Sequence, residues 1–184
     1  MLVLFMENML LIEDQCSLNF NQIKFLQQVL GGEFPWFFQR EKNYDETPFY
    51  FLVHTLMHRN EDNQPITGTI NSPYYDICIN IFKKFCEQHN VAVNTIYRAA
   101  LNCTMYNPNL TTRIHTDHKF EHKNFILYIN EFDNGQTCIF DLEHNLIKQT
   151  EPALHKAIIF GGEPHAHNFC LPNQRRVILV ITFD

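Results

Sequence analysis

Apolar residues recur with helical spacing in the first half of the chain and gather into short runs in the second half. Residues 18–30 present one apolar helical face, which two glycines then end. A second helix is predicted to begin at Ser72-Pro73, with a capping hydroxyl and a proline at its first position, and to reach about Asn90. Its apolar stripe consists of Ile77, Cys78, Ile81, Phe82 and Phe85. We expect both helices to cover a sheet.

Segments rich in β-formers make up most of the remaining pattern. Residues 34–38 and 49–53 are aromatic and apolar, which fits strands or a packed lid. Further runs follow at residues 95–106, 124–130, 137–140, 157–160 and 177–183. Asn134-Gly135 is a turn signal between two of these runs. Most runs are too close together for parallel crossovers, so the spacing predicts an antiparallel sandwich such as a jelly roll.

We therefore predict a single α+β domain over residues 1–184, with a double-stranded β-helix (jelly-roll) core and N-terminal covering helices. Residues 1–90 would be mostly helical support, and residues 91–184 would supply the strands and the site. A chain of 184 residues with 45% hydrophobic content is long enough to bury a core. No linker rich in proline, glycine or serine divides it.

Composition and charge indicate which binding partners and which cellular compartment to expect. A net charge of -6 and scattered basic residues disfavour nucleic acid as a principal partner. The six cysteines lack Cys-x-x-Cys spacing, which argues against a zinc knuckle and favours reduced thiols in an intracellular, cytoplasmic protein. Residues 1–12 are apolar but carry Glu7 and lack a basic leading region, so we expect a core element and no signal peptide. No run reaches the roughly 18 apolar residues that a membrane span needs.

Three side chains are candidate metal ligands. His115 and Asp117 stand two apart in an extended segment, so they project from one face while Thr116 points away. His165 follows an apolar run and two glycines, where the end of a strand would deliver an imidazole. Two imidazoles and one carboxylate are the ligands of a non-haem iron(II) centre that keeps open positions. By itself His-x-Asp is weak evidence in a chain with ten histidines, since it also fits a solvated turn.

Other histidines compete for these positions. His167 lies two residues beyond His165 and faces the same way in an extended segment, so it is an alternative third ligand. His118 and His122 are four apart and would fit a zinc cluster. Their charged neighbours favour a mobile polar loop that closes over a substrate.

Four segments, in order, carry a resemblance to a known family. They are the aromatic residues 34–38, Tyr106-Asn107-Pro108 nine residues ahead of His115, residues 125–137, and residues 160–177. The set resembles the iron(II)- and 2-oxoglutarate-dependent dioxygenases of the prolyl-hydroxylase-like group, especially the short versions common in phage and other microbial sequences. The resemblance covers roughly residues 34–184.

The resemblance implies roles for individual residues. His115, Asp117 and His165 correspond to the iron ligands. Arg176 corresponds to the residue that clamps the distal carboxylate of 2-oxoglutarate, a task that suits a guanidinium with two parallel donors. Arg175 is the alternative clamp, because the spacing allows either arginine and the two face opposite sides of the strand. Tyr106 would add a hydroxyl to the same carboxylate.

The implied activity is hydroxylation of a C–H bond in a protein, with prolyl residues the familiar target, or in a small molecule. Iron(II), 2-oxoglutarate and O2 would be required, succinate and CO2 released, and ascorbate would serve as a reductant. Asp117 fills the position that halogenating relatives leave for chloride, so halogenation is not expected. The alternative function is a non-catalytic or cupin-like metal-binding jelly-roll module, which has no reason to place an arginine after His165.

Overall fold

The structure, a computed structural model, describes residues 10–40, 50–60 and 64–184. Residues 1–9 and 49, on which two of the sequence predictions partly rest, lie outside the described residues. The elements in chain order are β1 (Leu11–Gln15), α1 (Phe20–Val29), β2 (Phe37–Arg40), β3 (Tyr50–His58), β4 (Thr69–Ile70), α2 (Tyr75–Gln88), β5 (Ile96–Met105), β6 (Lys123–Tyr128), β7 (Thr137–Phe140), β8 (Leu146–Thr150), β9 (Lys156–Gly161), β10 (His165–His167) and β11 (Arg175–Phe183).

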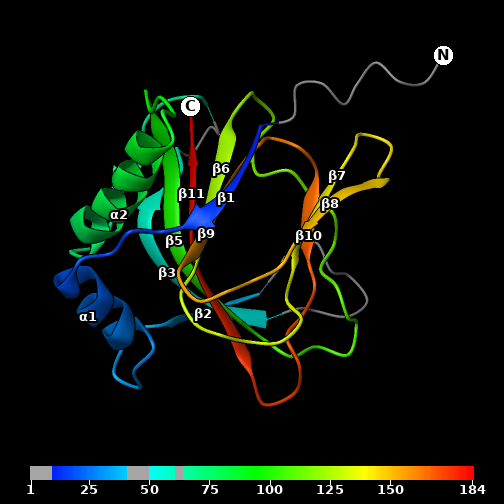
Figure 1. The fold of residues 1–184 in the computed structure, drawn as a ribbon, viewed down its shortest axis with the longest axis horizontal. Coiled ribbons are helices and arrows are strands. Elements are labelled where there is room, and N and C mark those ends of the chain that lie inside the picture. Colours follow the sequence, from blue (N-terminus) through cyan, green and yellow to red (C-terminus); the bar gives the residue numbers. More distant parts are fainter. Residues whose placement is uncertain (1–9, 41–49, 61–63) are drawn as a thin grey trace.

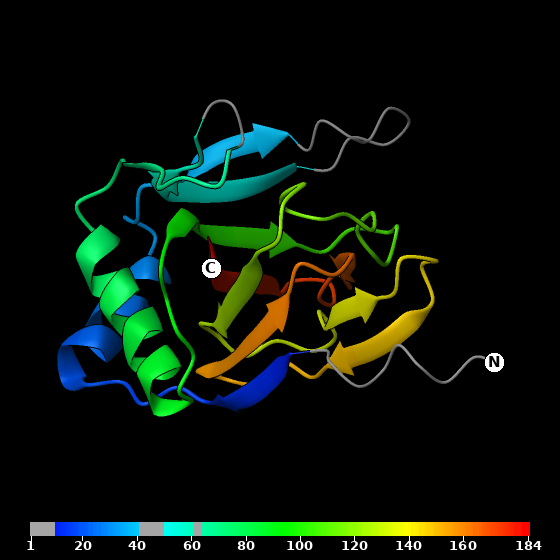
Figure 2. The same cartoon turned by 90° about the horizontal axis from the view of Figure 1, so that it is seen from above.

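Antiparallel strands form two sheets. The larger sheet has the order β1-β9-β6-β11-β5-β3-β2, with β4 paired to β3, and the smaller has the order β10-β7-β8. The last strand, β11, lies between β5 and β6. The smaller sheet stands on one side of the larger sheet and both helices lie on the other (Figures 1 and 2). Two antiparallel sheets in this arrangement are consistent with a jelly roll.

Each face of the larger sheet buries its own hydrophobic cluster. On the helix side, the strands contribute alternate residues such as Leu179 and Phe183, which pack with Phe82 and Phe85 of α2. On the other side, residues such as Val180 pack toward the smaller sheet. Strand alternation therefore gives the larger sheet one structural face and one face that lines the space between the sheets.

The helix-side cluster gives a stability prediction. Phe82 is fully buried and its ring meets those of Phe125 and Phe183 edge-on, at 5.2 and 4.8 Å between centroids. Phe82→Ala should destabilise the fold by about 3–5 kcal/mol, the usual cost of deleting a buried phenyl ring. Chemical denaturation measures the change. Phe20→Ala, at a mostly exposed ring on α1, is the control and should stay within roughly 0.5 kcal/mol of the wild type.

The β-rich runs of the second half correspond to β5, β6, β7, β9 and β11, but the first half is less helical than predicted. Among the described residues it contains β1, β2, β3 and β4 beside the two helices. The strand β3 lies between β2 and β5, and apolar residues from both of its faces join hydrophobic clusters, so its sequence lacks a regular alternation of apolar and polar residues.

The second helix also starts later than its sequence signal. Residue 75 is its first residue, and the hydroxyl of Ser72 accepts a hydrogen bond from the backbone N–H of Tyr74 at 3.1 Å, within the preceding turn. The same hydroxyl lies 2.7 Å from Nε2 of His54, which ties this turn to β3. Ser72 thus caps the approach to the helix and not its first turn.

The sequence predicts neither a membrane span nor a disulfide framework, and the described residues bear on both predictions. No helix there is both long and apolar enough to cross a membrane. All six cysteines lie in described segments, and each is buried and unpaired.

Candidate iron and cosubstrate site

A cavity of about 810 Å³ lies between the two sheets. Its walls come mainly from β3, β5, β6 and β11 of the larger sheet, from β7 and β10 of the smaller sheet and from the segment 112–117. This volume is within the range of small-molecule binding sites. The lining includes His115, Asp117, His165 and Arg176 of the predicted site residues.

His115 and His165 are direct partners across an antiparallel bridge. The N–H of His115 donates to the carbonyl of His165 at 3.0 Å, and the N–H of His165 donates to the carbonyl of His115 at 2.8 Å. Because paired residues of antiparallel strands project from the same face, both imidazoles enter the cavity, with ring centroids 4.6 Å apart. Backbone pairing therefore joins residues that are fifty positions apart in the chain.

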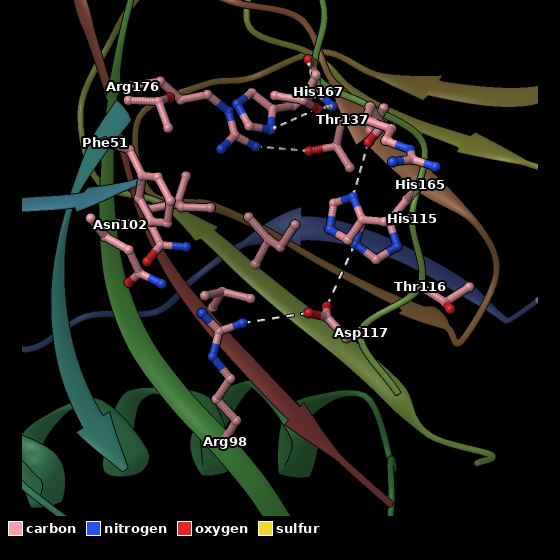
Figure 3. A pocket seen from close by; sticks show the side chains of 18 of the residues that line it. Phe51, Arg98, Asn102, His115, Thr116, Asp117, Thr137, His165, His167 and Arg176 are labelled. Atoms are coloured by element: carbon pink, nitrogen blue, oxygen red, sulfur yellow. Dashed lines mark hydrogen bonds and ion pairs between the residues drawn. The ribbon is translucent and has the colours of Figure 1, made fainter. Parts of the chain in front are cut away.

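Asp117 completes the group from two positions beyond His115. Its Oδ2 lies 3.5 Å from Nε2 of His165, and its side chain is 9% exposed. Thr116 points away from the three side chains, as expected for an extended segment (Figure 3). The structure thus brings together all three predicted metal ligands.

Backbone carbonyls orient both imidazoles. Nδ1 of His115 lies 3.0 Å from the carbonyl oxygen of Arg113, and Nδ1 of His165 lies 3.0 Å from that of Glu163. Since a carbonyl only accepts, each Nδ1 carries the proton and each Nε2 is left to bind an ion. A backbone carbonyl that accepts from Nδ1 is typical of histidines that bind a metal through Nε2.

The charges of Asp117 and His165 are coupled. Burial favours the neutral acid, yet the hydrogen bond and charge of His165, with Arg98 and His115, hold the pKa of Asp117 well below its usual 3.8. Burial also opposes the charge on His165, but Asp117 outweighs it and raises the pKa of His165 above its usual value. A cation that binds Asp117 would take over the contact that this imidazole makes and release its proton.

The donor set fits a ferrous ion, although the side chains are not in a finished coordination geometry. Within residues 10–40, 50–60 and 64–184, no three His, Cys, Asp or Glu side chains already surround a common point as a metal site would require. Here Asp117 and His165 contact each other directly. Two imidazole nitrogens and one carboxylate on one wall of a cavity are nevertheless the ligands of a facial iron(II) site with open positions.

Arg176 lies at the far end of the cavity from Asp117 (Figure 3). It is 2% exposed, its Nε donates to the carbonyl of Gly135 at 3.0 Å and its Nη2 donates to the hydroxyl of Thr137 at 3.1 Å. The guanidinium lies 5.7 Å from the centre of the Tyr128 ring. Burial lowers the pKa of Arg176, with Tyr128 acting in the opposite direction. A fixed, buried cation at this position suits a carboxylate.

Arg175 points elsewhere. Its guanidinium donates to the carbonyl of Leu30, just beyond α1, and it is not among the residues that line the cavity. Adjacent residues of a strand face opposite sides, so β11 directs one arginine to the helices and the other to the cavity.

Tyr106 does not reach the cavity in this structure. Its side chain is 46% exposed and lies outside the lining. Two other hydroxyls lie close to Arg176, and sequence reasoning missed both as site residues. Tyr128 bonds the hydroxyl of Thr137 at 2.8 Å, and Thr104, the ladder partner of Arg176, is buried with a hydroxyl that has no hydrogen-bond partner among the described residues. The available signal was the set of polar residues Arg98, Asn102 and Thr104, which share one face of β5.

The remaining histidines occupy different surroundings. His167 lines the cavity on the Arg176 side of His165, and its Nδ1 lies 3.5 Å from the hydroxyl of Thr112. Burial and the nearby charges of Arg176, His115 and His165 hold the pKa of His167 well below its usual value. His118 and His122 are buried, so the prediction of a mobile polar loop is wrong for these two side chains. Their rings pack 4.8 Å apart, and His118 bonds the hydroxyl of Thr182, which explains their burial.

A second group of charges near Asp117 was not predicted. Arg98 of β5 and Arg59, just after β3, lie 3.4 and 3.7 Å from Oδ1 of Asp117. Arg59 also donates to the backbone carbonyl of Asp117 at 3.1 Å. These contacts fix the carboxylate from the side opposite His165.

No protein-family model matches the sequence, and no curated protein matches it. Solved structures with a similar fold include a 2OG-Fe(II) oxygenase and prolyl hydroxylases. One is an oxidoreductase of the 2OG-Fe(II) oxygenase family from Burkholderia pseudomallei, with a TM-score of 0.73 and 13% identity over 96% of this chain and 84% of that one.

Two prolyl hydroxylases are similar in the same way. A prolyl hydroxylase from Trichoplax adhaerens, solved with a hypoxia inducible factor peptide fragment, has a TM-score of 0.63 and 10% identity over 94% of this chain and 82% of that one. A prolyl-4-hydroxylase from Pseudomonas putida has a TM-score of 0.55 and 14% identity over 94% and 91% of the two chains. At these identities the likeness concerns the fold.

Proposed function

We propose that this protein is an iron(II)- and 2-oxoglutarate-dependent oxygenase that hydroxylates a C–H bond. One O2 and one 2-oxoglutarate would be consumed, one oxygen atom would enter the substrate as a hydroxyl, and the other would enter succinate as CO2 leaves. The observation that carries the proposal is the His115–His165 backbone pair with Asp117 beside it, at one end of a cavity whose other end holds Arg176. The shared fold of the solved oxygenases supports it.

The residues divide the work between metal and cosubstrate. His115, Asp117 and His165 would hold iron(II), which when bound supplies the site at which O2 is activated. Arg176 would bind the distal carboxylate of 2-oxoglutarate and so fix the distance from that carboxylate to the metal. Thr137 holds the guanidinium in place through its hydroxyl.

Tyr128 and Thr104 are better placed than Tyr106 to complete the cosubstrate pocket. The ring of Tyr128 lies against the guanidinium of Arg176. The hydroxyl of Thr104 is buried in the lining, and a carboxylate oxygen would satisfy it. The apolar residues Ile126, Ile178 and Val180 line the same cavity and would keep water away from the reacting centre.

The proposal is tested by anaerobic addition of iron(II) and 2-oxoglutarate to the protein. A weak visible charge-transfer band of the chelate should appear at one equivalent of each. On admission of air with ascorbate, succinate should form slowly even without substrate. A protein that binds iron but gives neither the band nor succinate would instead fit a metal-binding jelly-roll module.

A further inference from the structure

The cavity is more positive than the composition of the chain would predict. The chain carries a net charge of -6, yet four of its six arginines line the cavity. Among the described residues, no lysine lines it and Asp117 is its one acidic side chain. The four arginines are Arg59, Arg98, Arg113 and Arg176. Counted over the described lining residues alone, four positive charges and one negative charge give a formal charge of +3.

Two of these cations converge on one oxygen. Nη1 of Arg98 and Nη2 of Arg59 lie 3.4 and 3.7 Å from Oδ1 of Asp117, whereas Oδ2 faces His165. The carboxylate therefore has a metal side and an arginine side. A single carboxylate cannot neutralise two guanidiniums, and once Asp117 also binds a divalent cation its attraction for them falls.

The guanidiniums of Arg59 and Arg98 have N–H donors that they do not use in these contacts, and both are accessible to a ligand. Each offers five N–H donors, while Arg98 uses one nitrogen and Arg59 uses two in the contacts they make. Their side chains are 22% and 39% exposed, so they are covered only in part. Both guanidiniums contact the same oxygen, Oδ1 of Asp117, so their positive charges repel each other at short range. An oxyanion between them would relieve this repulsion.

The cosubstrate does not account for this pair. In the proposed function, one carboxylate of 2-oxoglutarate binds Arg176 and the other binds the metal. Arg98 lies at the opposite end of the cavity from Arg176, beyond Asp117 (Figure 3). The pair is thus left for a second ligand that approaches the metal from the other side.

We propose that the substrate is a small organic anion whose carboxylate or phosphate group binds Arg59 and Arg98, which presents a C–H bond to the metal held by Asp117. This inference rests on the proposed function. The cavity volume of about 810 Å³ fits a small molecule beside the cosubstrate. Guanidinium groups recognise both oxyanions through paired hydrogen bonds, so the two sources are separated by experiment.

The test uses the full chain loaded with manganese(II) and 2-oxoglutarate, and calorimetry with two matched pairs of probes. Hexanoate is compared with hexanamide, and hexyl phosphate with hexanol. At least one anion should bind about tenfold or more tightly than its neutral partner, and the stronger of the two identifies the oxyanion. Arg59→Gln and Arg98→Gln should each weaken that anion about tenfold and leave the neutral probe unchanged. Arg40→Gln, on the exposed strand β2, is the control and should have no effect.

Several results would overturn the inference. Equal binding of anions and neutral probes would do so, as would an anion preference that survives both substitutions. Tighter binding of a proline-containing peptide or a single-stranded oligonucleotide, independent of Arg59, would replace the small anion by a macromolecule. The affinity for 2-oxoglutarate is measured on the same protein, so loss of cosubstrate binding would count against the proposed function, whereas normal cosubstrate binding without anion preference would count against this inference alone.

Discussion

Asp117→Asn should weaken iron(II) binding at least about 100-fold and abolish the charge-transfer band with 2-oxoglutarate. The substitution keeps the shape of the side chain but removes the negative charge that two histidines cannot replace. Loss of groups that only orient a ligand typically costs 10–100-fold in metal affinity, so loss of a ligand charge should cost more. Anaerobic titration followed in the visible range measures both effects.

The matched control is Asp14→Asn, which removes an exposed carboxylate on β1 that lies 3.4 Å from His89. Its iron affinity should stay within about twofold of the wild type. Thermal unfolding distinguishes the loss of a metal ligand from the loss of the fold. Asp117→Asn also removes the partner of Arg59 and Arg98, so thermal unfolding must show a folded protein before the titration is interpreted. An intact band in folded Asp117→Asn would remove Asp117 from the metal site.

The strands and the grouping of the three candidate metal ligands could be predicted from the sequence for a physical reason. A half-buried strand and a His-x-Asp segment are local patterns, and both depend on the alternation of side chains along an extended chain. The five runs of the second half accordingly correspond to strands, and His115 and Asp117 face the same cavity. The first half is less helical than predicted, because β1 to β4 lie among its described residues beside the two helices. The runs at residues 34–38 and 49–53, which fitted strands or a packed lid, overlap β2 and β3.

Contacts between residues that are far apart in the chain could not be predicted from the sequence in the same way. Asn134 and Gly135 do adopt the positive φ values, 62° and 72°, that their turn signal predicts. However, this turn links β6 of one sheet to β7 of the other, and the carbonyl of Gly135 accepts from Arg176. The pairing of Arg98 with Asp117 likewise depends on how β5 packs against the segment after residue 115. No local period encodes such contacts, which explains why the arginine pair was missed.

Replacement of Arg176 should have the second large effect, a loss of 2-oxoglutarate affinity of at least about 100-fold in Arg176→Gln. A hydrogen bond to a charged group is worth about 1.5–3 kcal/mol, and the guanidinium offers a carboxylate two of them together with its charge. Iron(II) affinity without cosubstrate should stay within about threefold, because Arg176 lies at the other end of the cavity from Asp117. Calorimetry on the manganese-loaded protein measures the affinity for 2-oxoglutarate, and anaerobic titration of the metal-free protein measures the affinity for iron(II).

Arg175→Gln is the matched control, since it differs from Arg176→Gln by one position on the same strand. It should lose the contact with the carbonyl of Leu30, lower the free energy of unfolding by about 1 kcal/mol and leave 2-oxoglutarate affinity within about twofold.

Because Arg176 also holds the carbonyl of Gly135, Arg176→Gln itself is expected to be less stable, and Arg176→Lys provides the check. Lysine keeps the charge but loses the planar pair of donors, so its affinity should fall between those of the other two proteins. The opposite pattern, with cosubstrate binding lost in Arg175→Gln and retained in Arg176→Gln, would assign the clamp to Arg175 and require β11 to shift by one residue against β5.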